Sequence, residues 1–491
     1  MLIVRSKLLI RSRSGLGFAG ARAAAAKKTS GFVNKTNNNN NNNNARQGLC
    51  LHTTTNSIVC ARDKVRHSSR GSSSSSSSSS RTVLAKAEVK MASAPIIHVD
   101  TTQYDSQLLA KVERVKTQFR DYYTDELEVY KSKKKHYRMR SEFRIWRDDG
   151  EIYYVMFKGG GRDAEKIRVD DFHVGSELVN ELMRKVIEGV RKSKVLEKKI
   201  FQANFHTTLS GQAMVSLLYH RKLDEEWKAE AEKRRESLAA AEGVEKGHVP
   251  SIIGRSRKQK VVLGHDYVVE TLPINGTDLM YQQLEGGFSQ PNGGMCIHML
   301  EWACKHTKES NSSDLLELYC GNGNFSIAMA SNFRKCVGTE LAKTSVAAAK
   351  YNIEANKVKN VFIARCSSED FSSAWLNNNK TFKRFQQQGL KLEDCDFQTV
   401  LVDPPRAGLD DDTVKLVSKF ERIVYISCNP DTLFNNVEAI GQTHKVVRMA
   451  LFDQFPYSHH TEIGCVLQRE TPQAVEEATD SNPIKKQKKE E

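Results

Sequence analysis

The sequence predicts an α/β protein with a doubly wound, mostly parallel sheet in its second half and a smaller α+β part before it. From about residue 284, short apolar runs alternate with helix-length segments at the spacing of βαβ units. Earlier in the chain, alternating strands and short turns are mixed with amphipathic helices. We therefore expect a leader at 1–97, an α+β domain at 98–283, an α/β domain at 284–470 and a charged tail at 471–491.

Composition narrows the class of protein. The chain has 491 residues, of which 39% are hydrophobic, enough for two or three domains. Its ten cysteines include no C-x-x-C pair, so we expect no zinc ribbon, iron–sulfur cluster or disulfide framework, and no bound metal. No apolar run approaches the roughly 18 residues that a membrane-spanning helix needs. We expect a soluble, monomeric protein in a reducing compartment.

The positive charge is concentrated at the N-terminus. Of the formal net charge of +15, residues 1–90 carry +14, from sixteen Lys and Arg and two acids. Such an Arg-rich, Ser-rich, acid-poor leader is typical of a transit peptide, which predicts a mitochondrial or plastid location. Met91 is an alternative start that would give a leaderless form in the cytoplasm or nucleus. Because the rest of the chain is almost neutral, nucleic-acid binding there requires a local basic patch.

A basic segment with interleaved aromatic residues occupies 131–147 in the first folded part. Its second half alternates as a strand does. One face then carries Arg138, Arg140, Glu142, Arg144 and Trp146, and the other carries Met139, Phe143 and Ile145. The first face could hold phosphates and stack bases, although a short basic run is more often a solvated sheet face. The other elements predicted in this part are helices at 107–122, 176–191 and 223–242, a strand at 151–157 that completes the first hairpin, and a second hairpin at 201–219.

A glycine-containing turn follows the first strand of the second part. The apolar run 314–318 leads into Tyr319-Cys-Gly-Asn-Gly-Asn324 and then into a helix. Glycine lets the backbone approach a ligand closely, but the spacing is not G-x-G-x-x-G, so a dinucleotide is not the expected ligand. The next strand ends at Glu340, 17 residues after Gly323, close to the position of a carboxylate that binds ribose hydroxyls. Together these features predict a site for an adenosyl ligand.

Three later segments place reactive side chains at strand ends. Asp403 follows a strand and is fixed by two prolines. Cys428 lies between an apolar strand and a helix that starts at Pro430, where backbone N–H groups favour a thiolate. Glu462 lies near the turn of a terminal antiparallel hairpin at 446–468. A single cysteine beside a strand is more often a small buried apolar residue, so this pattern alone leaves the role of Cys428 open.

Four segments of the second part carry a family pattern. They are Leu-Leu-Glu-Leu-Tyr-Cys-Gly-Asn-Gly-Asn-Phe (315–325), Val-Asp-Pro-Pro-Arg-Ala-Gly-Leu (402–409), Tyr-Ile-Ser-Cys-Asn-Pro (425–430) and Phe-Asp-Gln-Phe-Pro-Tyr-Ser-His-His (452–460). In these segments the chain resembles the tRNA (uracil-5-)-methyltransferases of bacterial type, over roughly residues 103–468. The resemblance implies a class I methyltransferase sheet with a terminal antiparallel hairpin, preceded by an α+β RNA-binding domain. It also implies S-adenosylmethionine as methyl donor and 5-methyluridine at position 54 of the tRNA T-loop (T-arm) as product.

The resemblance assigns roles residue by residue. Cys428 would be the nucleophile and Glu462 the general base. The residues implied to hold S-adenosylmethionine are Gln290, Tyr319, Gly321, Asn324, Glu340 and Asp403. The residues implied to contact the T-loop are Arg144, Phe201 and His220. Relatives that act on ribosomal RNA often carry a cysteine-ligated cluster and an added N-terminal barrel; neither is visible in this sequence, which favours tRNA.

The implied chemistry explains why these residue types are needed. Uracil C5 is a poor nucleophile, so the Cys428 thiolate would add to C6 and turn C5 into an enolate carbon that attacks the sulfonium methyl. Glu462 would then remove the C5 proton, and elimination would release the cysteine. The base must leave its stack, which costs less for a loop nucleotide. Two alternatives stay open: a 5-methyluridine methyltransferase of ribosomal RNA, and an RNA-folding chaperone whose binding is its main role.

Overall fold

The computed structural model describes residues 99–158, 164–377, 382–387 and 389–470. The predicted leader and charged tail lie outside the described residues. The transit peptide, the organelle location and the use of the Met91 start therefore stay predictions.

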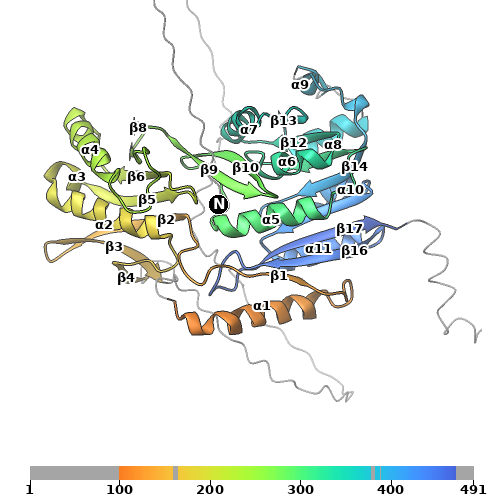
Figure 1. The fold of residues 1–491 in the computed structure, drawn as a ribbon, viewed down its shortest axis with the longest axis horizontal. Coiled ribbons are helices and arrows are strands. Elements are labelled where there is room, and N and C mark those ends of the chain that lie inside the picture. Colours follow the sequence, from red (N-terminus) through yellow and green to blue (C-terminus); the bar gives the residue numbers. More distant parts are fainter. Residues whose placement is uncertain (1–98, 159–163, 378–381, 388, 471–491) are drawn as a thin grey trace, which may run out of the picture. The chain divides into compact units, whose positions relative to one another are not determined.

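The second half of the chain folds around an eight-stranded sheet with the order β1-β16-β17-β15-β14-β11-β12-β13 (Figure 1). Strands β11 to β15 run parallel to one another, whereas β17 runs antiparallel between β15 and β16. This confirms the predicted doubly wound sheet with a terminal antiparallel hairpin. The strand order reverses at β11, so the carboxyl ends of β11 and β14 border the crevice where such sheets bind ligands. The strands are β1 (Glu128–Tyr130), β11 (Asp314–Leu318), β12 (Lys335–Glu340), β13 (Val361–Arg365), β14 (Phe397–Val402), β15 (Arg422–Ser427), β16 (His444–Phe452) and β17 (Glu462–Arg469).

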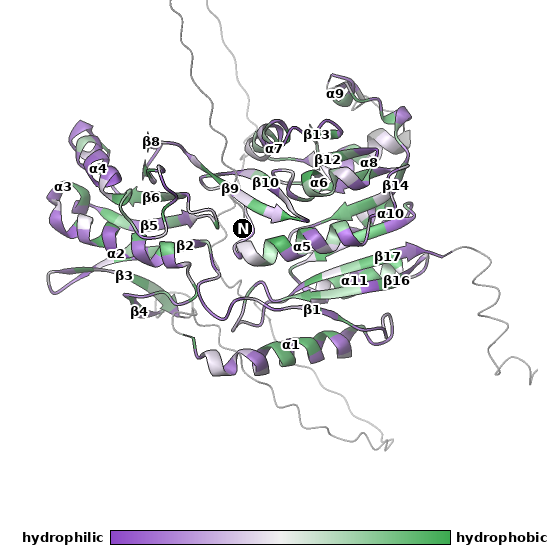
Figure 2. Ribbon diagram, in the orientation of Figure 1, coloured by the Kyte–Doolittle hydropathy of each residue, from purple (hydrophilic) through white to green (hydrophobic). Residues whose placement is uncertain are grey.

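The inner strands are buried on both faces, because helices cover both sides of the sheet. Along β15, Ile423 and Tyr425 enter one hydrophobic cluster, and Val424 and Ile426 enter another. A strand that is buried on both faces has a continuous run of apolar residues in the sequence, and this run is what predicted β15. Figure 2 shows the same apolar character along β14 and β17.

Side chains of α10 and α11 pack in the cluster that contains Ile423 and Tyr425. Side chains of α5, α6 and α7 pack in the cluster that contains Val424 and Ile426. The helices of this half are α5 (Gly293–Lys305), α6 (Asn324–Ala328), α7 (Lys343–Ala355), α8 (Ser368–Asn377), α9 (Phe382–Gln386), α10 (Asp411–Val417) and α11 (Pro430–Ile440), with short 3-10 turns η2 (Ala330–Asn332) and η3 (Leu392–Asp394). In the part of the chain that the structure describes, no helix is both long and apolar enough to cross a membrane.

Helix α1 (Tyr104–Phe119), preceded by η1 (Thr101–Gln103), packs with this sheet, although it lies in the range predicted for the α+β domain. Its buried side chains join the cluster that contains α11. Strand β1 likewise pairs in parallel with β16. The sequence pattern predicts the helix, but an amphipathic helix can cover either core, so the pattern does not show which one. The predicted domain boundary at 283/284 stays a prediction.

A second sheet has seven strands in the order β4-β3-β2-β5-β6-β7-β8. Both predicted hairpins are present, as β2–β3 and β5–β6. Strand β7 was not predicted, because Gly254 interrupts its pattern; a side chain there would collide with Trp227. The elements are β2 (Arg140–Asp148), β3 (Glu151–Lys158), β4 (Glu165–Val169), β5 (Ile200–Thr207), β6 (Ala213–Tyr219), β7 (Ser251–Ser256), β8 (Gln259–Leu263), α2 (Glu177–Lys192), α3 (Lys194–Glu197) and α4 (Glu225–Leu238).

Strands β9 (Tyr267–Ile274) and β10 (Thr277–Leu284) form an antiparallel ribbon. Leu272, Ile274 and Tyr281 of this ribbon pack in the same cluster as α5 and α7. The ribbon was not predicted, yet it brings side chains to the ligand cleft described below.

Candidate active site

Cys428 lies directly after β15 and directly before the N-cap residue of α11. The N-cap Asn429 accepts a hydrogen bond from the Asp431 N–H through its Oδ1 (3.2 Å), and Pro430 occupies the first helical turn, where its missing N–H costs nothing. Asn429 Nδ2 also donates to the Arg406 carbonyl (3.0 Å), which ties the loop after β14 to the start of α11. The predicted strand-to-helix turn is confirmed, with Cys428 partly exposed at the carboxyl edge of the sheet.

Glu462 is the first residue of β17 and lies beside Cys428. Ser427 pairs with Ile463 across β15 and β17, so the next pair along this register would be Cys428 and Glu462. On its other side, Glu462 pairs with Phe452 of β16. Only 3% of Glu462 is exposed. The register of the antiparallel β15–β17 pair therefore brings together the two residues predicted for catalysis.

The environment of Cys428 opposes ionisation. Burial raises the pKa of its thiol to about 12, the carboxyls of Glu462 and Asp403 act in the same direction, and Arg406 opposes them. Burial and the neighbouring Asp403 also raise the pKa of Glu462 well above its ordinary value, again opposed by Arg406. Burial raises the pKa of Asp403 to about 7. In the free protein, burial and two acids therefore outweigh the effect of the N–H groups at the helix start, and the thiolate form of Cys428 stays a prediction.

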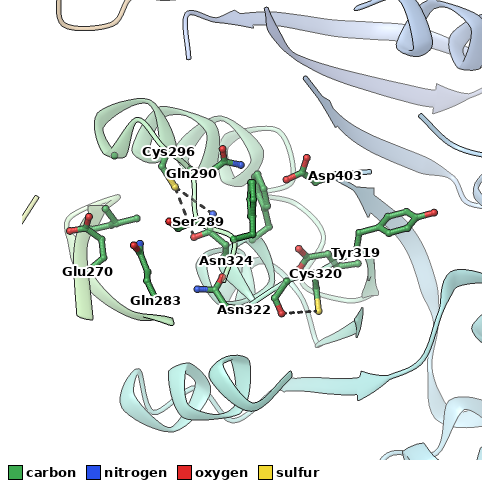
Figure 3. Close-up of a pocket in the computed structure, with 16 residues that line it drawn as sticks. Glu270, Gln283, Ser289, Gln290, Cys296, Tyr319, Cys320, Asn322, Asn324 and Asp403 are labelled. Carbon is green, nitrogen blue, oxygen red and sulfur yellow. Dashed lines mark hydrogen bonds between the residues drawn. The ribbon is translucent and has the colours of Figure 1, made fainter. Parts of the chain in front are cut away.

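A cleft lies at the carboxyl ends of β11 and β14, where the strand order reverses. It also receives residues from the segment before α5 and from the β9–β10 ribbon, and Figure 3 shows Gln290, Asn324 and Asp403 around it. Gly321 and Gly323 in its turn have φ of 55° and 80°, which glycine adopts without strain. Five of the six residues implied to hold the methyl donor line this cleft: Gln290, Tyr319, Gly321, Asn324 and Asp403.

Glu340 and Tyr319, two of these six residues, also make hydrogen bonds within the protein. Glu340 supports the glycine turn from behind, because its Oε2 accepts from the Gly321 N–H (3.1 Å) and its Oε1 from the Ala342 N–H (2.6 Å). Its contact with a ribose stays a prediction. The Tyr319 ring points away from the other labelled residues in Figure 3, and its hydroxyl accepts a hydrogen bond from Ser368 Oγ (3.0 Å).

Other cleft residues were not predicted. Glu270 and Gln283 come from the β9–β10 ribbon, and Phe288 lines the cleft although 61% of it is exposed. Burial raises the pKa of Glu270 to about 7 and that of Glu317, at the cleft floor, to about 8. The ribbon carries no motif that indicates a part in ligand binding.

The three residues implied to contact RNA lie together on the second sheet. The rings of Phe201 and His220 stack with centroids 3.9 Å apart and an interplanar angle of 10°. The Arg144 guanidinium lies over the Phe201 ring, 5.3 Å from its centroid. Arg144 and Phe201 come from the neighbouring strands β2 and β5, and His220 follows β6, so the sheet itself assembles this group.

A basic groove adjoins this stack. Phe201 and His220 line it together with four cations: Arg221, Lys222, Arg255 and Arg257. Arg221 pairs with Asp224 (3.1 Å) and Arg255 pairs with Glu285, so part of this charge is compensated within the protein.

The predicted nucleic-acid face of β2 is smaller than expected. Glu142 and Arg144 are exposed and Phe143 is buried, as the alternation predicts. The side chains of Arg138 and Arg140, however, donate hydrogen bonds to backbone carbonyls of the protein. Arg138 Nε donates to the Arg140 carbonyl (2.8 Å), and Arg140 donates to the Gly287 carbonyl (2.7 Å).

The fold and the cleft together define a class of protein, the class I S-adenosylmethionine-dependent methyltransferases. The strand order, the glycine turn after β11 and the acid that ends β12 carry this assignment. The model of the tRNA (uracil-5-)-methyltransferase family matches residues 103–470, and the chain belongs to this family.

Known proteins agree with this assignment. The chain is 50% identical over 371 residues to the tRNA/tmRNA (uracil-C(5))-methyltransferase of Shewanella loihica, covering 76% of this chain and 98% of that protein. It is 49% identical over 373 residues to the enzyme of the same name from Vibrio parahaemolyticus, covering 76% and 99%. Among solved structures, the tRNA (uracil-54, C5)-methyltransferase of Pyrococcus abyssi in complex with S-adenosyl-L-homocysteine matches with a TM-score of 0.54 and 20% identity, covering 76% of this chain and 86% of that one. That likeness shows the fold.

Proposed function

We propose that this protein methylates C5 of uridine 54 in the T-loop of tRNA through a covalent bond between Cys428 and C6 of the base. The pairing of β15 with β17 is the observation that carries the proposal, because it puts a cysteine and a buried carboxyl side by side at the sheet edge. Membership of the tRNA (uracil-5-)-methyltransferase family supports tRNA and uracil as the substrate. The name of the Pyrococcus abyssi protein, which has the same fold, supports position 54.

The residues of the cleft fit a methyl donor with an adenosyl group. The glycine turn permits close approach of a ligand to the backbone, and Gln290, Asn324 and Asp403 offer polar groups to it. When bound, S-adenosylmethionine supplies a methyl group on a positively charged sulfur. A positive charge in the cleft favours the ionised forms of Asp403, Glu462 and Cys428, whose pKa values burial raises.

Cys428 and Glu462 divide the chemistry on the base between them. The Cys428 thiol loses its proton to solvent, its sulfur bonds to C6, and the electrons of the C5–C6 double bond move onto C5 and O4. After C5 has gained its methyl group, Glu462 takes the C5 proton. The electrons of that C–H bond rebuild the double bond, and the C6–sulfur bond breaks. Burial of Glu462 suits this role, because a raised pKa makes a carboxylate a stronger base.

The second sheet offers a surface for the RNA. The Phe201–His220 stack presents aromatic faces on which unstacked loop bases can lie, and Arg144 adds a cation above the ring. The adjoining groove, with Arg255 and Arg257, suits the phosphate backbone.

The test is methyl transfer from labelled S-adenosylmethionine to an isolated T-arm hairpin, with uridine or cytidine at position 54. We expect incorporation into the uridine hairpin, none into the cytidine hairpin and none with Cys428→Ala. Equal incorporation into both hairpins would refute the assignment to position 54. No incorporation into either, by protein that binds S-adenosylmethionine, would move the assignment to ribosomal RNA or to an RNA chaperone.

A further inference from the structure

Gln454 is a buried glutamine with an incomplete set of hydrogen bonds. Only 1% of it is exposed, and its Nε2 donates to Oε1 of Gln290 (2.6 Å). Its own Oε1 is buried and has no hydrogen-bond partner among the residues that the structure describes. Leaving a buried amide oxygen unsatisfied destabilises a protein, so an apolar side chain would suit this position better. The hydrogen bond to Gln290 is the interaction that a glutamine makes at this position and an apolar side chain cannot.

This bond decides which part of Gln290 a ligand meets. Gln290 lines the cleft, and its amide has one oxygen, which accepts, and one NH2 group, which donates twice. Because Gln454 occupies the oxygen, the NH2 group is the part that Gln290 offers to the cleft. Without Gln454, the amide could turn over and present its oxygen instead.

The backbone around Gln454 is anchored to helix α1. The neighbouring Asp453 is fully buried, and its Oδ1 accepts from Lys111 Nζ (2.7 Å) while its Oδ2 accepts from Gln107 Nε2 (3.2 Å). Lys111 also donates to the Phe455 carbonyl (2.8 Å), on the other side of Gln454. The residues before and after Gln454 are thus held from α1, which fixes the position of its amide.

We propose that Gln454 is a positioning residue for the methyl donor. It fixes the Gln290 amide so that the NH2 group donates to an acceptor atom of the bound donor, and the Lys111–Asp453 pair fixes Gln454 in turn. This inference rests on the proposed role of the cleft as the S-adenosylmethionine site. It gives helix α1 a part in cofactor binding, although α1 does not line the cleft.

The test compares S-adenosylhomocysteine binding to the full chain and to Gln454→Met by titration calorimetry. Methionine has a similar size and cannot hold the Gln290 oxygen. We expect the dissociation constant to rise about tenfold, the effect of losing roughly one hydrogen bond, while the melting temperature stays equal or rises. In steady-state methylation, KM for S-adenosylmethionine should rise with little change in kcat. The control is Gln468→Met, which removes a glutamine bonded to Arg422 (3.3 Å) at the far end of β17.

A double-mutant cycle shows whether Gln454 acts through Gln290. Gln290→Leu should weaken binding, and adding Gln454→Met to it should cost nothing further. Gln290→Glu is a second probe, because it keeps an acceptor for Gln454 but removes the NH2 group, and it should weaken binding as Gln454→Met does. An unchanged dissociation constant in Gln454→Met, additive losses in the double variant, or an equal loss in Gln468→Met would overturn the proposal. Since the binding measurement contains no RNA, these outcomes are independent of the uridine-54 assignment.

Discussion

Glu462 lies beside Cys428 at the end of the β15–β17 pair, and after burial its carboxyl is the largest contribution to the raised pKa of the Cys428 thiol. The pKa of Glu462 is raised as well, by burial and then by Asp403. Both groups therefore hold their protons more tightly than an ordinary cysteine or glutamate. A bond from Cys428 to C6 removes the cost of a buried thiolate, which links ionisation of this cysteine to substrate binding.

Replacing Glu462 with glutamine should trap the reaction after methyl transfer. The glutamine keeps the shape of the side chain but cannot take the C5 proton, so the Cys428–C6 bond cannot break. We expect kcat to fall by about 10²–10⁴-fold and a protein–RNA complex to persist in a denaturing gel. Cys428→Ala is the control and should give no complex. Turnover by Glu462→Gln at the wild-type rate would show that another group is the base.

Cys428 should react slowly with iodoacetamide in the free protein. With its pKa raised to about 12, only a small fraction is thiolate at pH 8. We expect alkylation of Cys428 to be at least about 100-fold slower than that of free cysteine. Mass spectrometry of the peptide that contains Cys428 measures this rate. Asp403, with a pKa of about 7, is ionised at pH 8, so Asp403→Asn removes a negative charge, lowers the pKa of the thiol and should accelerate alkylation. A wild-type rate similar to that of free cysteine would contradict the described electrostatics.

The Phe201–His220 stack and the basic groove should contribute to RNA affinity in different ways. Phe201→Ala should weaken binding of the T-arm hairpin by about 1–3 kcal/mol at every salt concentration, because it removes a stacking surface. Arg257→Ala should weaken it mainly at low salt and reduce the slope of log K against log[salt] by about one, because it removes a phosphate contact. Lys415→Ala, a surface cation of α10, is the matched control. Affinities unchanged in both Phe201→Ala and Arg257→Ala would place the RNA elsewhere.

Glu270 should make stability depend on pH. Its pKa rises from 4.5 to about 7 on burial, so the folded protein keeps the proton in a range where the unfolded chain has lost it. Stability therefore falls as pH rises from about 4.5 through 7, and the ionised carboxylate costs up to about 3 kcal/mol above pH 7. Glu270→Gln keeps an acceptor for the Leu209 N–H (2.9 Å) and removes this cost. Urea unfolding at pH 5 and pH 8 should show the variant gaining stability over wild type only at pH 8; a difference independent of pH would contradict the assignment.

The arrangement of the site at the sheet edge follows from local patterns. Each apolar run predicted a strand, and the carboxyl ends of parallel strands meet at one edge. This is why the glycine turn with Asn324, Asp403 and Cys428 could be placed together from the sequence. Glu462 joins them because the terminal hairpin pairs with β15.

Features that depend on long-range packing could not be predicted. Nothing in the amphipathic pattern of α1 shows that Lys111 meets Asp453 far along the chain. The β9–β10 ribbon has no motif, so its contribution of Glu270 to the cleft had no signal. The pKa of Cys428 depends on two acids from other strands, whereas the sequence argument considered only its own helix.

The covalent mechanism is tested most directly with a T-arm hairpin that carries 5-fluorouridine at position 54. Fluorine replaces the proton that Glu462 removes, so the adduct with Cys428 should form in the presence of S-adenosylmethionine and then persist. Mass spectrometry should find the methylated nucleotide attached to the peptide that contains Cys428. Methylation of the uridine hairpin without any adduct from the fluorinated one, or attachment at a different residue, would contradict the account.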